Sequence, residues 1–108
     1  MFKLNDEATP VEMFPGIVRR ALTGGERMTV CEITLYKDAV VPPHSHEDEQ
    51  AGYVIRGRML FKIGEEEREI GAGYGDLAPG SVPHALTALE DSLIVEVFSP
   101  PRKGYLEP

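Results

Sequence analysis

The sequence predicts an all-β domain that closes into a barrel or a two-sheet jelly roll. Eleven glycines and nine prolines are spread through the 108 residues and divide the chain into short segments. Such breaks are typical of strands that end about every 8–12 residues. Because closure removes the exposed edges of a sheet, a barrel or jelly roll is the expected arrangement.

Four segments have the composition of β-strands. Each is rich in β-branched and aromatic residues and lacks a helical spacing of apolar positions. In chain order, these segments are residues 28–36, 49–55, 59–63 and 92–98. Short runs with residues suited to tight turns separate them, at residues 23–26, 37–38, 56–58, 64–65, 71–73 and 78–80. The pattern predicts a succession of hairpins.

Composition and charge exclude several classes of protein. Apolar residues make up 42% of the chain, and no apolar run approaches the roughly 18 residues of a membrane helix, so we expect a soluble protein without a membrane partner. Eleven Lys and Arg against eighteen Asp and Glu give a net charge of −7, which argues against nucleic-acid binding. A lone cysteine, Cys31, and a start without signal-peptide features predict one cytoplasmic domain over residues 1–108.

The three histidines carry the strongest functional signal. In an extended strand, His44 and His46 point to the same side about 6.6 Å apart, so both rings can reach one ion. Gln50 has the same parity and lies just beyond them, while His84 follows two prolines that stiffen its approach. A lone histidine is more often structural. Three imidazoles with one oxygen donor, however, suit a divalent transition metal with positions left open for substrate.

The spacing of these residues resembles the two metal-binding motifs of the cupins, G-x5-H-x-H-x3-E-x6-G and G-x5-P-x-G-x2-H-x3-N. The residues in register are His44, His46, Gln50, Gly57, Gly73, Pro79 and His84. The motifs cover residues 38–57 and 73–88. The resemblance implies a double-stranded β-helix barrel with a divalent metal at its wider end, held by the histidines and residue 50.

Several positions depart from the cupin motifs. Asp38 and Ser81 stand where the motifs have glycine, and Ala88 stands where the second has Asn. Gln50 replaces the acidic ligand, and Glu49 immediately precedes it. A neutral amide donor leaves the metal more positive, which suits a Lewis-acid role toward an anionic substrate. Use of Glu49 instead would shift the strand register by one and turn its neighbours to the other face, so we favour Gln50.

A narrower resemblance runs nearly from end to end, to the small bacterial cupins of pectin and alginate breakdown. The stretches that carry it are residues 16–20, 44–57 and 97–102. Members of that family open the ring of C4–C5 unsaturated monouronates to give linear keto uronates. The resemblance implies that Glu96, in place of the family's Asp, acts with Phe98 and Arg102 as the active residues. It also implies a small anionic sugar as substrate and a homodimer.

Glu96 has an unusual position within its predicted strand. It shares a face with Ile94 and Phe98, and both faces of the segment are otherwise apolar. One interpretation places it at the solvent side of a half-buried edge. The other places it inside the barrel, where desolvation raises its pKa and suits it to exchange protons near neutrality. A carboxylate inside the barrel would need a metal, a water or an arginine nearby.

Arg102 follows two prolines, a stiff extended segment that can carry the chain across the mouth of the barrel. Its planar guanidinium can form two charge-assisted hydrogen bonds with a uronate carboxylate. The alternative is a solvated arginine beside Lys103. Tyr53 and Phe98 are candidate cavity residues, although aromatic residues on strands more often belong to the core.

These features favour a metal-dependent enzyme that opens the ring of unsaturated uronates. The ligand set does not identify the metal, which we expect to be Zn, Ni, Mn or Fe. Two other classes stay open because one fold supports many functions. One is a metal-dependent dioxygenase acting on a small molecule, and the other is a non-catalytic module that binds a small sugar or acid.

Overall fold

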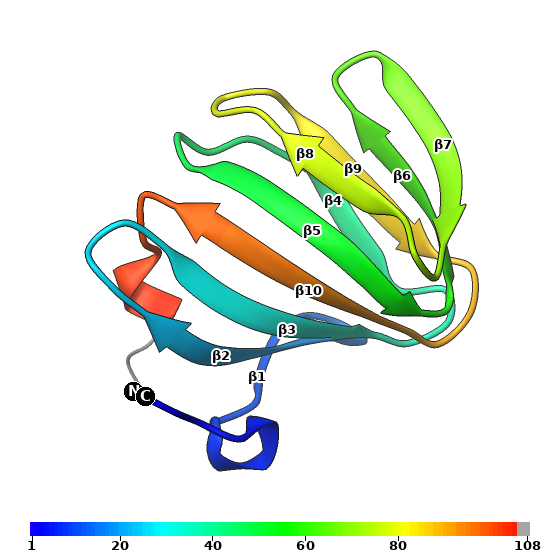
Figure 1. Cartoon of the computed structure of the whole chain (residues 1–108). Helices are drawn as coiled ribbons and strands as arrows, with labels where there is room; N and C mark the ends of the chain where they lie inside the picture. The colour runs from blue at the N-terminus through cyan, green and yellow to red at the C-terminus, as the bar shows by residue number, and fades with distance from the viewer. Residues whose placement is uncertain (106–108) are drawn as a thin grey trace.

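The computed structural model describes residues 1–105, which form two antiparallel β-sheets that face each other (Figure 1). The larger sheet has six strands in the order β1-β2-β3-β10-β5-β8, and the smaller has four in the order β4-β9-β6-β7. The elements are η1 (Asn5–Glu7), β1 (Val11–Phe14), β2 (Ile17–Gly24), β3 (Thr29–Leu35), β4 (Val40–His44), β5 (Glu49–Arg56), β6 (Arg58–Ile63), β7 (Glu66–Gly71), β8 (Gly75–Ala78), β9 (His84–Ala88), β10 (Ser92–Ser99) and η2 (Lys103–Tyr105). The predicted all-β jelly roll is confirmed.

The four strands predicted from composition are present as β3, β5, β6 and β10, each within one residue of its predicted ends. Several of the strands that composition did not single out, namely β1, β4, β7 and β8, lie at sheet edges. Edge strands tolerate prolines and charges that central strands exclude, and β4 contains two consecutive prolines. Within residues 1–105, no helix is long and apolar enough to cross a membrane.

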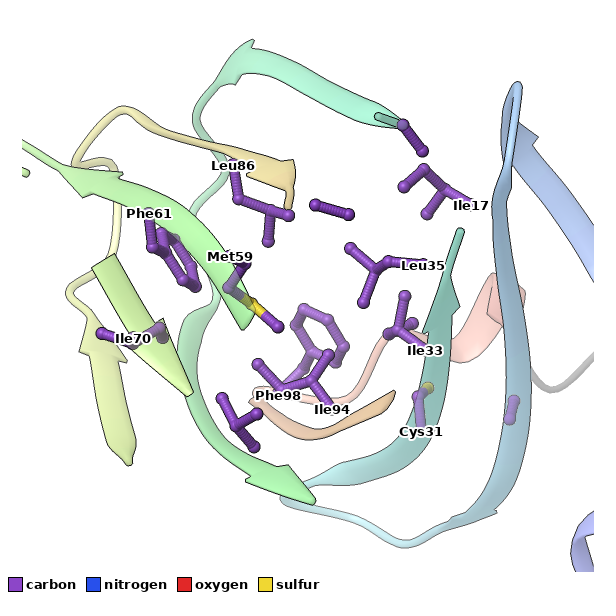
Figure 2. Close-up of a cluster of buried hydrophobic side chains, with 14 residues drawn as sticks. Ile17, Cys31, Ile33, Leu35, Met59, Phe61, Ile70, Leu86, Ile94 and Phe98 are labelled. Carbon is purple, nitrogen blue, oxygen red and sulfur yellow. The ribbon is translucent and has the colours of Figure 1, made fainter. Parts of the chain in front are cut away.

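The core lies between the two sheets, where alternate side chains of each strand meet (Figure 2). Every second residue of β3, β9 and β10 is buried, which is the period of two expected of strands with one face on a core. Leu35 and Ile94 from the larger sheet face Met59 and Phe61 from the smaller one, and all four are at most 4% exposed. Each such side chain contributes about 1.5–3 kcal/mol by burial.

Two turns bear on the departures from the cupin motifs. Asp38 and Ser81, which replace motif glycines, both have left-handed backbone, with φ of 72° and 65°. The turn at Asp38 is fixed because its amide N–H donates to the carbonyl oxygen of Ala88 at 2.8 Å. Asp38 and Ser81 therefore adopt the left-handed conformation that glycine adopts more easily. The two turns precede β4 and β9.

Candidate active site

The four predicted metal ligands come from three strands and one loop. His44 ends β4 and His84 begins β9, and the two are paired directly across the smaller sheet. His46 lies in the loop that leads to the larger sheet, and Gln50 is the second residue of β5. The structure brings all four predicted ligands to one end of the barrel, where they line the same cavity.

The geometry of the histidines prepares them to bind a cation. One ring nitrogen from each of His44, His46 and His84 lies within 4.8 Å of the others. In each ring, Nδ1 lies 2.9–3.0 Å from a backbone carbonyl oxygen two residues away. A carbonyl only accepts hydrogen bonds, so each Nδ1 carries the proton and each Nε2 offers its lone pair. Three lone pairs therefore converge.

Two features of the ring nitrogens show whether these residues fit a divalent metal. The Nε2 of His84 is buried and has no hydrogen-bond partner within the described residues, and burial lowers the pKa of His84, which favours the neutral ring that metals bind. The Nε2 of His46 lies 3.2 Å from Oε1 of Gln50, which places two acceptor atoms side by side. A cation between these atoms satisfies both, so the donor set fits a divalent ion.

The structure favours Gln50 over Glu49 as the oxygen donor. The side chain of Gln50 is 4% exposed and lines the cavity, whereas Glu49 is exposed. The register of β5 against β10 pairs Gln50 with Phe98, whose side chain also points inward. Glu49 has the opposite parity and could reach the site only if β5 slipped by one residue, which would expose the inward side chains.

The cavity beside the histidines is small and mostly apolar. Its volume is about 70 Å³, and both sheets contribute to its wall. Three predicted active residues, Glu96, Phe98 and Arg102, line it together with the four predicted ligands. Met13 from β1 and Tyr105 from η2 line it as well.

Glu96 points into the barrel and is 7% exposed, so the solvent-edge interpretation is wrong. Its row across the larger sheet places Cys31 on one side and Gly52 on the other. Burial, together with a smaller effect of the Asp76 carboxylate, raises the pKa of Glu96 to about 8, although a hydrogen bond to Gln50 and the charge of Arg102 act in the opposite direction. A carboxyl group that titrates near neutrality therefore lies beside the candidate metal ligands.

Asp76 was not predicted as a site residue. Gly52 of β5 lies between Asp76 of β8 and Glu96 of β10, and it is paired with both across the larger sheet. A Cβ at Gly52 would lie 2.6 Å from Oδ2 of Asp76. Both carboxylate oxygens of Asp76 are buried without a hydrogen-bond partner among the described residues, and burial raises its pKa to about 6. Because Gly52 has no side chain, it leaves space for the carboxyl group of Asp76. The sequence near Asp76 does not predict this contact, which depends on how β8 pairs with β5.

Arg102 crosses the mouth of the cavity and is not a solvated tail residue. Its Nη1 lies 2.8 Å from Oδ2 of Asp48, and the two side chains are 25% and 17% exposed. Its backbone N–H donates to Oγ1 of Thr29 at 2.9 Å. The guanidinium lies 5.2 Å from the centre of the Phe98 ring. The segment after the two prolines therefore folds back over the barrel.

Of the two aromatic residues predicted to line the cavity, Phe98 belongs both to the core and to the cavity wall. The prediction for Tyr53 is wrong, because its side chain lies on the outer face of β5 and is 52% exposed. Phe98 is 3% exposed, and its ring centre lies 6.0 Å from that of His46. It packs on Tyr105 at 5.6 Å, a residue of the tail that no sequence pattern singled out. The alternation of side chains along β10 predicts that Phe98 points inward. The position of Tyr105 cannot be predicted in this way, because it depends on how the segment after β10 folds back onto the barrel.

Comparison with known proteins agrees with this geometry. Residues 31–99 match the family described as the cupin domain. The pectin degradation protein KdgF of Dickeya dadantii (strain 3937) is 29% identical over 105 residues, which are 95% of this chain and 96% of that protein. The structure of KdgF from Halomonas sp. is 32% identical, with a TM-score of 0.91 and coverage of 98% of both chains.

An RmlC-like cupin from Shewanella frigidimarina is similar in fold alone, with a TM-score of 0.90, 21% identity and coverage of 96% of this chain and 94% of that one. The structure is an antiparallel two-sheet β-barrel with three histidines at one end. Together with the family match over residues 31–99, this shows that the chain belongs to the cupin family. Within that family, its similarity along nearly the whole chain makes it a KdgF-like cupin.

Proposed function

We propose that this protein is a metal-dependent enzyme that converts C4–C5 unsaturated monouronates from pectin or alginate into linear keto uronates. One arrangement supports the proposal above all, namely that the buried carboxyl of Glu96 lines the same cavity as the three histidines and Gln50. The similarity to a pectin degradation protein, KdgF of Dickeya dadantii, adds support.

The reaction requires one proton to move within the substrate. In an unsaturated uronate, the ring oxygen joins the anomeric carbon C1 to C5 of the C4–C5 double bond. When the anomeric hydroxyl loses its proton, the bond between C1 and the ring oxygen breaks, leaving an aldehyde at C1 and an enolate over C4, C5 and the former ring oxygen. Protonation at C4 then gives the keto uronate, so neither an oxidant nor a reductant takes part.

Glu96 is suited to carry that proton. Because burial raises its pKa to about 8, both its acid and its carboxylate form are accessible near neutral pH. As a carboxylate, it accepts the proton of the anomeric hydroxyl, and as an acid it delivers a proton to C4. The apolar surroundings, with Ile94 and Phe98 on the same strand face, keep bulk water from competing for the proton.

The remaining side chains would bind and orient the substrate. His44, His46, His84 and Gln50 would hold a divalent ion, which supplies Lewis-acid polarisation of substrate oxygens when bound. Gln50 is neutral, so the ligand set adds no negative charge that would repel an acidic sugar. Arg102 lies at the cavity mouth with its guanidinium over Phe98, where it can approach the substrate carboxylate.

The test combines metal analysis with a ring-opening assay. The purified protein is loaded separately with Zn, Ni, Mn and Fe, and the loss of the C4–C5 double bond is followed by ultraviolet absorbance for both pectin-derived and alginate-derived unsaturated monouronates. We expect turnover with at least one metal, loss of turnover after chelation, and recovery when the metal is returned.

The two alternative classes give different results in the same assay. Oxygen uptake that depends on substrate would indicate a dioxygenase. A rise in melting temperature with uronate, without any product, would indicate a binding module. Either result would reject ring opening as the activity.

The partners of the protein are also proposals. A small acidic sugar follows from the proposed reaction. A homodimer is supported by apolar side chains on the outer face of the larger sheet, where Tyr53, Ile55 and Leu77 are 52%, 44% and 52% exposed. Light scattering during size-exclusion chromatography measures the mass in solution, and a mass of one chain would reject the dimer.

A further inference from the structure

The cavity is too small for a sugar as it stands. Its volume of about 70 Å³ accommodates about two water molecules, each of which occupies roughly 30 Å³ in the liquid. Pockets that bind small organic ligands usually measure about 300–1,000 Å³. Part of the cavity wall must therefore move before a hexuronate can enter.

Arg102, the cation that family resemblance assigns to the substrate, is already paired. Its Nη1 lies 2.8 Å from Oδ2 of Asp48, and both side chains are largely buried. A substrate carboxylate would have to share this guanidinium with Asp48 or displace a short ion pair. A second positive group would therefore help to bind an acidic substrate in a chain whose net charge is −7.

Arg19 is a positive side chain on the inner face of the larger sheet. It lies on β2 between the buried Ile17 and Ala21, and it pairs across the sheet with Ile33, which lines the cavity. Its Nε is buried without a hydrogen-bond partner, and no ion pair within residues 1–105 involves it. Because a partly buried charge without a counter-ion is costly, and no carboxylate of residues 1–105 pairs with Arg19, this position suits an anion.

Tyr105 lines the cavity, and its ring stacks on Arg19, which is not among the cavity-lining residues. The ring of Tyr105 lies 4.0 Å from the Arg19 guanidinium and 4.7 Å from that of Arg102. Its hydroxyl donates to the sulfur of Met13 at 3.7 Å, and a side-chain hydrogen bond with Tyr105 is one of the interactions that raise the pKa of Arg102. Cation–π and aromatic contacts contribute about 0.5–2 kcal/mol each, and Tyr105 belongs to η2 and to neither sheet, so its ring can be displaced without breaking any strand pairing.

We propose that Arg19 is a second anion-binding side chain of this site, and that Tyr105 covers it until an acidic ligand enters. Displacement of the ring enlarges the cavity and frees Arg19 for a carboxylate, while Arg102 keeps its contact with Asp48. The identity of the acidic ligand as a uronate rests on the proposed function. The inference itself is that Arg19 binds the carboxylate in addition to Arg102.

The first experiment measures binding of galacturonate, a saturated uronate that cannot undergo the reaction, with galactose as its neutral counterpart. Calorimetric titration is carried out on the metal-loaded wild type, Arg19→Gln, Arg19→Lys and Arg56→Gln, the last of which removes an exposed positive charge from β5. We expect Arg19→Gln to weaken galacturonate binding by about tenfold to a hundredfold, as for loss of a charged hydrogen bond. Arg19→Lys should recover part of the affinity, and Arg56→Gln should match the wild type.

A second measurement makes its decisive comparison on the wild type alone, with and without galacturonate. Phenylglyoxal labels accessible arginines, and mass spectrometry of peptides reports the extent at each position. Arg19 of the wild type should be labelled slowly, Tyr105→Ala should accelerate labelling several-fold, and galacturonate should suppress it. Unchanged galacturonate affinity in Arg19→Gln, or labelling of Arg19 that galacturonate does not affect, would overturn the proposal.

The outcomes separate this inference from the proposed function. If galacturonate binding depends on Arg19 but no unsaturated uronate is turned over, the ring-opening activity fails and the assignment of Arg19 stands. If unsaturated uronates are turned over with the same KM in Arg19→Gln and in the wild type, the activity stands and the role of Arg19 is rejected.

Discussion

Glu96 is the residue whose chemistry distinguishes the proposed reaction from simple metal binding. Substitution by Gln keeps the shape and the polar contacts but cannot exchange a proton. We expect Glu96→Gln to bind metal like the wild type and to lose about 10²–10⁴-fold in kcat on the unsaturated uronate, the usual contribution of general acid–base catalysis. Metal content and kcat are measured on the same preparation.

Glu49→Gln is the matched control for this variant, because Glu49 is exposed and lies beside the site in sequence only. It should keep both metal and turnover. Full turnover in Glu96→Gln would remove Glu96 from the mechanism, and loss of metal in that variant would show that the carboxyl acts through the ligands.

Asp76 should make folding stability depend on pH. The unfolded chain ionises this carboxyl near its ordinary pKa of 3.8, whereas the folded protein retains the proton until about pH 6. The contribution of the protonated Asp76 to the free energy of unfolding is therefore fully present below about pH 3.8 and is lost as the pH rises through about 6. We expect Asp76→Asn to be more stable than the wild type by about 1–2 kcal/mol above pH 6, after allowance for screening, and to lose this advantage near pH 4.

Urea unfolding at pH 4.5 and 7.5 measures this difference. Asp6→Asn, which removes the same charge from an exposed side chain, should show no such change between the two pH values. A constant difference between Asp76→Asn and the wild type would mean that Asp76 does not retain its proton in the folded state.

The parity of positions along one strand predicts which side chains face the interior. His44, His46 and Gln50 line one cavity, as their spacing predicts, and Glu96 lies on the same inner face as Phe98. Parity acts over a few residues of one strand, so it needs no knowledge of the partner strand. Asp76 and Arg19 were missed because their surroundings come from neighbouring strands and from the returning tail, which no local pattern contains.

At the scale of elements, the central strands are predictable and the edges are less so. The central strands β3 and β10 are rich in β-branched residues, as suits strands with a neighbour on each side. The edge strand β4, in contrast, begins with two valines and continues with two prolines. Asp38 and Ser81 show the same limit for turns. Both residues have a left-handed backbone, although neither is glycine, so the residue type alone does not predict the turn.

The turn between β5 and β6 requires glycine at position 57. Gly57 has φ of 96°, and a Cβ there would overlap the side chain and backbone of Ser92. Ser92 in turn accepts a hydrogen bond from the amide of Arg58 at 3.1 Å, so it cannot move freely. We expect Gly57→Ala to lower the free energy of unfolding by about 2–4 kcal/mol, the combined cost of backbone strain and overlap.

Gly25→Ala is the matched control for Gly57→Ala, because a Cβ at Gly25 meets no atom within 4 Å. Urea unfolding of both variants measures the difference. A loss of similar size in the two variants would mean that the cost comes from replacing glycine in general and not from the contact between this turn and β10.

For the whole molecule, the candidate metal centre links the two sheets. His44 and His84 belong to β4 and β9 of the smaller sheet, and Gln50 belongs to β5 of the larger one. A cation held by all three would connect the sheets at one end of the barrel. Since the unfolded chain cannot gather these ligands, the free energy of metal binding adds to the stability of the fold.

Metal should therefore raise the melting temperature. A free metal concentration one hundred times the Kd stabilises the fold by about 2.7 kcal/mol, which corresponds to roughly 10–20 °C for a chain of this size. His84→Ala should abolish this rise, because it removes one of the three converging nitrogens, whereas Glu49→Gln should keep it. Calorimetry of each protein with chelator and with excess metal checks this, and melting of the wild type that no metal changes would refute a cation joining the two sheets.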